Sequence, residues 1–416
     1  METFEYLYET YDTDEEPTNL QRSYEDDEDA TLIPLGIIAL TAFSLILGNE
    51  EEVDEDVFTR EHPGYIPRIA LVDPNLSPWV KLYASNSERS MITFTGLNYA
   101  SFHFIAIRFE DLYNKYTPYS SDGRIRIKPT RGRYFRPRSL DSRGCLALVL
   151  AYGRSRGNIY QICMLFGVIK TVGSLWIRFG RRLLLKILWG IPSSRVRMPS
   201  LGDIRIFQEI ITSRYPTLQD VWFVMDGLKM AIGAADDYSS QLLFYNHWQH
   251  GHFITNLFVF SPDGCICACS LNNPGSIHDS QIAEYGAVYQ KLQRQYDICG
   301  GKGIADSAFS RERLPCIIRT SRVAPLNEFE SQQHREAISV RQSAEWGNRG
   351  FKASFPRLND TIQYEEYGER LLILLSAVYL YNFRSRYVGF NQIQTVFLPH
   401  LEEYNANVVY SWVHNV

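Results

Sequence analysis

Hydrophobic and polar residues follow a helical period in the middle of the chain. Residues 146–152 are an apolar run that predicts a helix, with Asp141 or Ser142 as its cap. Residues 158–166, which begin with a capping asparagine, predict a second, shorter helix. A glycine turn then leads into a third helix over about 170–189. We therefore expect three consecutive helices joined by short turns.

The third helix has two distinct faces. Its apolar side chains follow the spacing of a buried face, and they are Val172, Leu175, Trp176, Phe179 and Leu183. Basic and small polar side chains lie on or near another face, and they are Lys170, Ser174, Arg178, Arg181 and Arg182. This pattern is typical of a helix-turn-helix unit, in which the helix after the turn contacts a DNA groove. A three-helix unit with a purely structural role is the alternative.

After residue 220 the pattern changes to that of strands. Residues 221–225 are a continuous apolar run, typical of a strand buried on both faces, and this strand ends at Asp226. A hairpin follows, with strands over 253–261 and 265–271 around a Pro-Asp-Gly turn. A helix is then expected from residue 278 to about 295.

The last predicted elements complete an α/β pattern. Residues 303–305 form a short apolar strand that ends at Asp306, and a helix over about 340–355, with Ser339 as its cap, carries Glu345 on a polar face. A strand with Asp, a hairpin, a helix, a strand with Asp and a helix with Glu follow one another in the order of a ribonuclease-H-like domain. The predicted fold class is therefore α/β, with a ribonuclease-H-like nuclease domain after an all-α helix-turn-helix unit and an acidic N-terminal tail.

This order of elements brings carboxylates together. Adjacent parallel strands would present Asp226 and Asp306 side by side, and Glu345 would close the site. Three converging carboxylates repel one another, but they suit two Mg²⁺ or Mn²⁺ ions, which prefer oxygen ligands. Such ions activate the attacking oxygen and stabilise the leaving oxygen at a phosphodiester. The alternative for each acid by itself is a structural one, namely a charged residue at the end of a strand or on the surface of a helix.

Charge divides the chain into two unlike parts. The chain has 416 residues, 45% of them hydrophobic and 21% charged, which excludes a small disulfide scaffold and a wholly disordered chain. Residues 1–62 hold 19 acidic side chains against Arg22 and Arg60, a net charge of −17. The formal charge of the whole chain is −5, so residues 63–416 carry +12. The basic body favours a polyanionic partner.

The charge pattern and the elements suggest four parts. They are an acidic tail with an apolar helix (1–62), a helical and basic connector (63–140), a helix-turn-helix-like DNA-binding unit (141–200) and the nuclease domain (218–395). Within the connector, the Arg-rich and Lys-rich stretch 124–143 is a phosphate-contacting segment, a nuclear localisation patch or a solvated linker. The uncharged stretch 31–48 is long enough to raise the question of a membrane span. Pro34, Gly36 and the lack of a basic anchor favour a buried helix, and we expect no membrane association.

Several further residues have ordinary structural interpretations. Seven cysteines without a Cys-x-x-Cys pair favour a reducing compartment, and no secretory signal is visible. The alternating cysteines within 265–269 fit small buried hydrophobes. The histidines within 247–252 lack the matching Cys/His pair of a zinc site. Asp279, at the start of a predicted helix, fits an N-cap or positioning role better than direct metal binding.

Six short blocks of the sequence form a series of motifs. They are Met225-Asp226-Gly227, residues 273–280 (Asn-Pro-Gly-Ser-Ile-His-Asp-Ser), 305–309 (Ala-Asp-Ser-Ala-Phe), 341–347 (Arg-Gln-Ser-Ala-Glu-Trp-Gly), 355–358 and 388–393. This series resembles PIF/Harbinger-type DDE transposases, most closely the version seen in fungi and oomycetes. The resemblance spans roughly 146–393. It implies that Asp226, Asp306 and Glu345 are the metal-binding triad, supported by His278 and Asp279.

The resemblance also implies a function and partners. The family's enzymes cut DNA at transposon ends and join the freed 3′ hydroxyl to a target, so we expect a Mg²⁺-dependent endonuclease and transposase in the nucleus. A separate Myb-like protein and self-association into a homo-oligomer are the partners expected besides DNA. The alternative is a domesticated, non-mobile derivative that only binds DNA or a partner protein. A membrane-tethered protein that uses residues 31–48 is a third reading.

Overall fold

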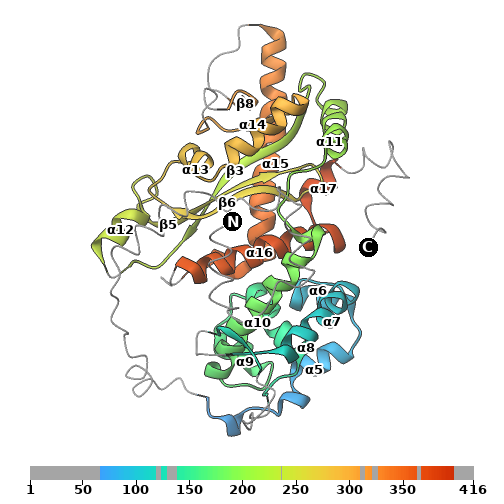
Figure 1. The fold of residues 1–416 in the computed structure, drawn as a ribbon, viewed down its shortest axis with the longest axis vertical. Helices are drawn as coiled ribbons and strands as arrows, with labels where there is room; N and C mark the ends of the chain where they lie inside the picture. Colours follow the sequence, from blue (N-terminus) through green and yellow to red (C-terminus); the bar gives the residue numbers. More distant parts are fainter. Residues whose placement is uncertain are drawn as a thin grey trace. The chain divides into compact units, whose positions relative to one another are not determined.

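The chain divides into two compact units in the computed structural model (Figure 1). Among the described residues, one unit lies within 66–187 and the other within 188–397. The structure describes residues 66–118, 123–128, 138–235, 237–309, 314–320, 327–362 and 367–397. The predicted acidic tail, the apolar stretch 31–48 and residues 129–137 of the basic connector lie outside the described residues. Among the described residues, no helix is long and apolar enough to cross a membrane.

The first unit is helical. Its elements are α5 (Pro78–Ala84), α6 (Glu88–Thr95), α7 (Tyr99–Lys115), β1 (Tyr116–Pro118), β2 (Ile125–Ile127), α8 (Ser142–Arg154), α9 (Ile159–Met164) and α10 (Lys170–Gly190). Two short 3-10 turns, Arg68–Ala70 and Pro74–Leu76, precede them. The three predicted helices are confirmed as α8, α9 and α10, and the expected caps Asp141 and Asn158 accept backbone N–H groups at the starts of α8 and α9.

Aromatic side chains hold the helical unit together. The Trp79 ring on α5 stacks on Phe94 and on Phe166, with centroid distances of 5.9 and 5.8 Å. Gly167 makes the turn before α10 with a φ of 67°, and a side chain there would collide with the backbone near Pro74. Because α5, α6 and α7 pack on the predicted three helices, the part of 63–140 that the structure describes belongs to the same unit.

A short β-hairpin crosses α10, and the sequence analysis did not predict it. Strands β1 and β2 pair antiparallel, and the Lys128 amide donates to the Lys115 carbonyl at 2.9 Å. The hairpin approaches α10 so closely that a side chain at Gly123, whose φ is 77°, would lie 2.7 Å from the Arg178 Cβ atom. The described part of the basic connector is therefore folded against the helical unit.

The second unit contains a six-stranded mixed sheet. Its strands are β3 (Val221–Ala231), β4 (Tyr245–Asn246), β5 (Gly251–Phe260), β6 (Ile266–Pro274), β7 (Lys302–Ala305) and β8 (Ile317–Arg319). They lie in the order β4-β5-β3-β7-β8, and β6 pairs with β5. Strands β3, β5 and β6 are antiparallel, whereas β3, β7 and β8 are parallel. This mixed sheet is consistent with a ribonuclease-H-like domain, which confirms the α/β prediction at that level.

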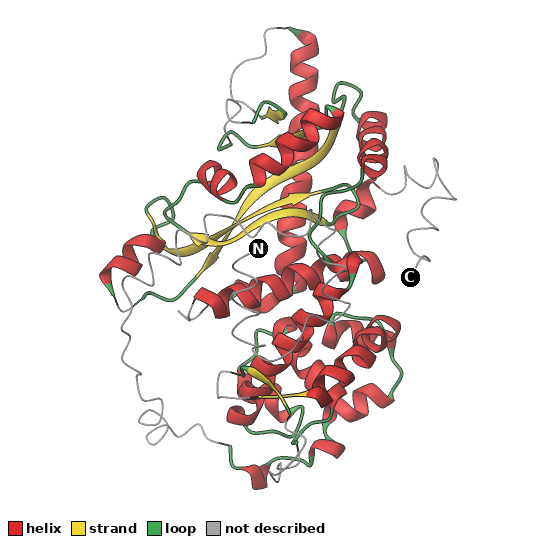
Figure 2. Ribbon diagram, viewed as in Figure 1, coloured by secondary structure: helices red, strands yellow, loops and turns green. Residues whose placement is uncertain are grey.

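Helices surround this sheet, as Figure 2 shows. They are α11 (Leu201–Arg214), α12 (Tyr238–Phe244), α13 (Asp279–Tyr285), α14 (Val288–Cys299), α15 (Glu328–Ser354), α16 (Tyr367–Tyr387) and α17 (Gln392–Phe397), with 3-10 turns at Pro192–Ser194 and Pro356–Asn359. Helix α15 packs closely on the sheet, because a side chain at Gly347 would lie 2.7 Å from the Phe260 ring. The Phe351 ring one turn later packs against Phe258 in a tilted arrangement, with ring centroids 5.0 Å apart. These contacts fix the height and rotation of α15 over β3 and β5.

Three predicted boundaries were wrong. Strand β3 continues to Ala231 because β5 pairs with it beyond the end of β7, so Asp226 lies within the strand. The helix expected over 278–295 is broken into α13 and α14 at Ala287, whose φ is 52°. Helix α15 begins at Glu328 under an Asn327 cap, so Ser339 lies inside the helix.

Candidate functional site

Asp226 lies where the parallel and antiparallel halves of the sheet meet. Its Oδ1 atom accepts the Gly227 amide at 2.9 Å, and its Oδ2 atom accepts the Asn348 Nδ2 atom of α15 at 3.0 Å. Strand β7 ends beside β3 at Ala305, so the next residue, Asp306, emerges at the same edge. The structure thus brings together the two aspartates expected from the order of the strands.

The electrostatics of Asp226 reflect this crowding. Burial and the negative charges of Asp306 and Asp279 raise its pKa to about 7, against the partial opposition of the Gly227 hydrogen bond and the Arg341 charge. A carboxyl group with such a pKa loses its proton most readily when a cation arrives. Without a metal ion, the charge of Arg341 therefore offsets only part of the repulsion among the three aspartates.

Asp279 completes a cluster of three aspartates, and its predicted N-cap role was wrong. His278 caps α13 instead, because its Nδ1 atom accepts the Ser280 amide at 3.3 Å. The Asp279 carboxylate packs over Gly227, where an added Cβ atom would lie 2.5 Å from Oδ2. Burial and the charge of Asp306 raise the pKa of Asp279, and the facing Lys229 lowers it. Gly227 is thus needed so that Asp279 can approach β3.

A comparison with known protein families locates this site. Residues 225–382 match the family described as DDE superfamily endonuclease. They form a DDE endonuclease domain. The matched segment begins one residue before Asp226 and includes Asp279, Asp306 and all of α15. Neither the curated proteins nor the solved structures gave a significant match to the chain.

Glu345, the expected third acid of the DDE endonuclease domain, is paired with a cation. Its Oε1 atom lies 2.7 Å from the Arg341 guanidinium one turn earlier on α15, and 46% of its side chain is exposed. Asn348, three residues later, is the α15 side chain that contacts Asp226. Residues three apart are neighbours on a helix surface. Glu345 therefore borders the aspartate cluster but is not bonded to it in this conformation.

Sequence reasoning missed Asn348, which is 7% exposed. Its Nδ2 atom faces Asp226 because a carboxylate only accepts hydrogen bonds. The Oδ1 atom of the same amide is buried and finds no hydrogen-bond donor among the described residues. The sequence does contain a signal for Asn348. This residue follows Ala344 by four positions and precedes Phe351 by three, so it shares a helix face with two fully buried residues. A polar residue in a buried helical stripe points to a buried partner.

The donor chemistry of the site suits a hard divalent cation. The aspartate oxygens and the unpartnered Asn348 oxygen are the ligand types that Mg²⁺ prefers, and Mg²⁺ commonly takes only one or two carboxylates, with waters and substrate phosphates completing its shell. Within the described ranges, no three His, Cys, Asp or Glu side chains are arranged to hold one ion by themselves. The residues present therefore fit an ion that is shared with a phosphate.

The predicted DNA-contacting residues of α10 are dispersed. Lys170 is exposed, and its Nζ atom lies 5.2 Å from the Tyr160 ring centroid. Ser174, Arg178 and Arg181 are half-buried. Arg182 is buried at 8% exposure, so its side chain does not lie on an open surface of α10. The turn at Gly123 covers part of the same face, because it packs on the Arg178 Cβ atom.

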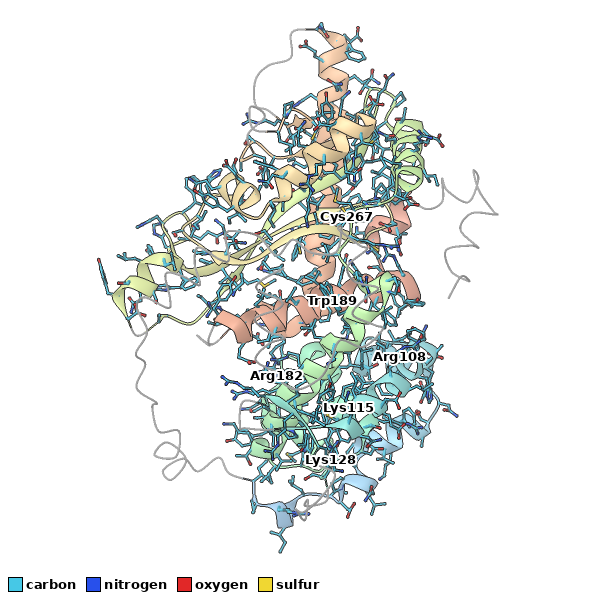
Figure 3. The ribbon with its side chains drawn as sticks, viewed as in Figure 1. Arg108, Lys115, Lys128, Arg182, Trp189 and Cys267 are labelled. Atoms are coloured by element: carbon cyan, nitrogen blue, oxygen red, sulfur yellow. The ribbon has the colours of Figure 1, made fainter. Side chains whose placement is uncertain are left out.

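The cysteines and histidines of the DDE domain have structural surroundings. Burial raises the pKa of the Cys265 and Cys267 thiols, and Cys267 lies within the sheet (Figure 3), as expected for small buried hydrophobes. Tyr245 lies between His247 and His252, with ring centroids 5.0 and 5.5 Å away. These rings pack on an aromatic side chain, and they do not form a cation-binding cluster with other described residues.

Proposed function

We propose that this protein is a metal-dependent DNA endonuclease and transposase of the PIF/Harbinger type. It cuts phosphodiesters at transposon ends and transfers the 3′ hydroxyl to target DNA. The observation that carries the proposal is the pair Asp226 and Asp306 at one edge of a ribonuclease-H-like sheet, inside a DDE endonuclease domain. The charge of Asp306 raises the pKa of Asp226, and a divalent cation that offsets this repulsion suits phosphoryl chemistry on DNA.

Asp226, Asp306 and Glu345 would hold two Mg²⁺ or Mn²⁺ ions, with Asp279 and His278 in support. When bound, the ions supply Lewis-acid stabilisation of the attacking and leaving oxygens. Asn348 and the Gly227 amide orient the Asp226 carboxylate before any ion arrives. Arg341 pairs with Glu345 at 2.7 Å and would release this acid when it turns to a metal ion.

Cleavage and strand transfer test the proposal directly. The purified protein is incubated with DNA that carries the ends of its own element, in Mg²⁺, in Mn²⁺ and in EDTA. We expect nicks with 3′ hydroxyl ends in either metal and joining of those ends to a second DNA molecule. Stable binding of the end DNA without nicking in Mg²⁺ or Mn²⁺ would instead support the domesticated, non-catalytic derivative.

Asn348 offers a separate test of how Asp226 is oriented. Asn348→Leu removes the 3.0 Å hydrogen bond to Asp226 and keeps the number and branching of the side-chain heavy atoms. We expect single-turnover cleavage to fall by about tenfold, which corresponds to roughly 1.4 kcal/mol, and Mn²⁺ to bind more weakly in a titration followed by electron paramagnetic resonance. Unchanged Mn²⁺ affinity and unchanged cleavage would show that Asn348 only fills space.

We assign DNA binding in part to the helical unit. Lys115 and Lys128 are joined by a backbone hydrogen bond next to the β1–β2 hairpin, and both side chains are exposed; Figure 3 labels them. Exposed lysines that lie near one another offer positive charge to DNA phosphates. The α10 residues Lys170, Ser174, Arg178 and Arg181 add to this contact where they are accessible. The proposed partners are DNA, a Myb-like companion protein and a second copy of the chain. The proposed location is the nucleus.

Salt dependence tests the hairpin contact. Each lost phosphate contact lowers the slope of log affinity against log salt by about 0.9. The double substitution Lys115→Ser and Lys128→Ser should therefore reduce the slope by about 2 and weaken binding of all duplexes alike. Lys81→Ser on α5 is the matched control, because Lys81 is also an exposed lysine of the helical unit. Equal slopes for the wild type and the double variant would remove the hairpin from the DNA interface.

A further inference from the structure

A tryptophan lies fully in solvent at the tip of the β4–β5 hairpin in the DDE domain. Residues 247–250 form the turn, all four are exposed, and Trp248 is 89% exposed. The other tryptophans of the described ranges are buried or half-buried. An indole offers a large apolar surface, and leaving it in water forgoes the stabilisation that burial provides. Trp248 contributes little to the folded core and is available to a partner.

The tip has a fixed shape. Asn246, at the end of β4, is 8% exposed, and its Oδ1 atom accepts the Gln249 amide at 3.0 Å across the turn. Its Nδ2 atom donates to the Gly275 carbonyl at 2.6 Å. One buried side chain therefore shapes the turn and anchors it to the loop after β6, which presents Trp248 in a preorganised position.

The anchoring loop leads to the aspartate cluster. The Ser276 hydroxyl donates to the Leu243 carbonyl at 2.7 Å, just before β4. A side chain at Gly275 would lie 2.8 Å from the Phe244 carbonyl, so only glycine fits at this junction. Three residues after Ser276 the same loop reaches Asp279. The tip and the aspartate cluster are thus attached to a single framework.

The strands set the distance between the tip and the site. Asp226 pairs with Phe258 on β5, and Tyr245 pairs with His252 farther along the same strand. Six residues separate Phe258 from His252, which corresponds to about 20 Å at roughly 3.4 Å per residue. A DNA strand advances about 3.4 Å per nucleotide. A strand that runs from Asp226 along β5 would reach the tip after about six nucleotides.

The chemistry of the tip favours a nucleobase over a protein groove. The exposed neighbours of Trp248 in the turn are His247, Gln249 and His250, so the indole is not part of a wider apolar patch on the turn. No Asp or Glu occurs from residue 245 to 260, so neither the turn nor β5 repels phosphate. A single flat aromatic ring with hydrogen-bonding neighbours suits stacking on one base.

We propose that Trp248 stacks on an unpaired nucleobase about six nucleotides from the phosphate held at Asp226 and Asp306. The position relative to the cut rests on the proposed endonuclease function, whereas stacking itself does not. The loss of one stacked base costs about 1 to 3 kcal/mol, equivalent to roughly a 5- to 150-fold change in affinity.

Fluorescence anisotropy with the full-length protein in EDTA tests the stacking. The probes are a 20-nucleotide single strand of mixed sequence and the corresponding duplex. Trp248→Ala should weaken binding of the single strand by about tenfold and leave the salt slope unchanged, because stacking releases no counterions. Trp248→Phe should restore part of the affinity. Phe390→Ala is the matched control, because Phe390 is an exposed aromatic residue at 68% exposure on another loop.

A second measurement tests the position of the stacked base. In EDTA, 2-aminopurine is placed at successive positions of a nicked duplex, and its fluorescence should change most about six nucleotides from the nick in the wild type but not in Trp248→Ala. Equal single-strand affinity for the wild type and Trp248→Ala, or an equal loss in Phe390→Ala, would overturn the stacking. A stacking signal without metal-dependent cleavage would count against the endonuclease function alone.

Discussion

Asp226→Asn and Glu345→Gln are each expected to lower Mg²⁺-dependent cleavage of end DNA by about 1,000-fold, equivalent to roughly 4 kcal/mol. Each substitution removes one negative charge from the set of oxygen ligands and leaves the shape of the side chain almost unchanged. DNA affinity in EDTA should change little, because neither side chain carries the positive charge that binds phosphate. Single-turnover cleavage of a labelled duplex measures the loss.

A control variant on α15 and a comparison of Glu345 with Asn348 show which side chain of this helix contributes to the site. Glu328→Gln neutralises an exposed acid in the first turn of the same helix and should cleave like the wild type. Glu345 is paired with Arg341 in the structure, so a carboxylate role requires it to exchange that partner for a metal ion. Full cleavage by Glu345→Gln alongside a loss in Asn348→Leu would mean that α15 contributes to the site through Asn348.

The positions of Asp226 and Asp306 could be anticipated because they depend on strand order. A buried apolar run that ends in an acid indicates a strand, and parallel neighbours place such acids at one edge of a sheet. The sequence could not show how far β3 continues, because that depends on pairing with β5 over residues 253–260. Long-range pairing also explains why Asp226 is held inside a strand.

Helix faces were harder to predict than helices. Trp176, Phe179 and Leu183 of α10 are buried, as their spacing indicated. Periodicity identifies an apolar stripe, but it does not show which polar stripe another segment will cover. The hairpin turn at Gly123 packs against Arg178 from more than 50 residues away in the sequence. Its residues carry no strong strand pattern, so the basic face of α10 looked more open than it is.

The same limit applies to α15. The polar stripe of this helix directed attention to Glu345, whereas the contact with Asp226 comes from Asn348 at the edge of the buried stripe. A lone polar residue among Ala344, Gly347 and Phe351 gave a sequence signal. What it could not give was the identity of the partner, because that depends on how Gly347 lets α15 approach the sheet.

Asp226→Asn should also stabilise the metal-free protein at neutral and alkaline pH. Burial, Asp306 and Asp279 raise the pKa of Asp226 from 3.8 to about 7, although the Gly227 amide and Arg341 favour the charged form. A raised carboxyl pKa means that the folded state binds the proton more tightly than the unfolded state. The resulting stability is fully present below about pH 4 and is lost as the pH rises through 7.

A comparison of Asp226→Asn with the wild type separates the pH-dependent stability due to Asp226 from that due to the other titrating groups. The rise in the pKa of Asp226 from 3.8 to about 7 corresponds to roughly 4 kcal/mol, and part of it depends on the charge of Asp279, whose own pKa is also raised. In EDTA, the free energy of unfolding of Asp226→Asn should therefore exceed that of the wild type by a few kcal/mol at pH 8, and the difference should vanish near pH 4. Urea denaturation at both pH values measures this difference.

The opposite result would be a variant that is less stable than the wild type at pH 8. It would show that Asn348, Gly227 and Arg341 stabilise the ionised Asp226 carboxylate more than burial and the neighbouring aspartates destabilise it. Mg²⁺ should raise the stability of the wild type more than that of the variant, because only the wild type retains the charge that attracts the ion.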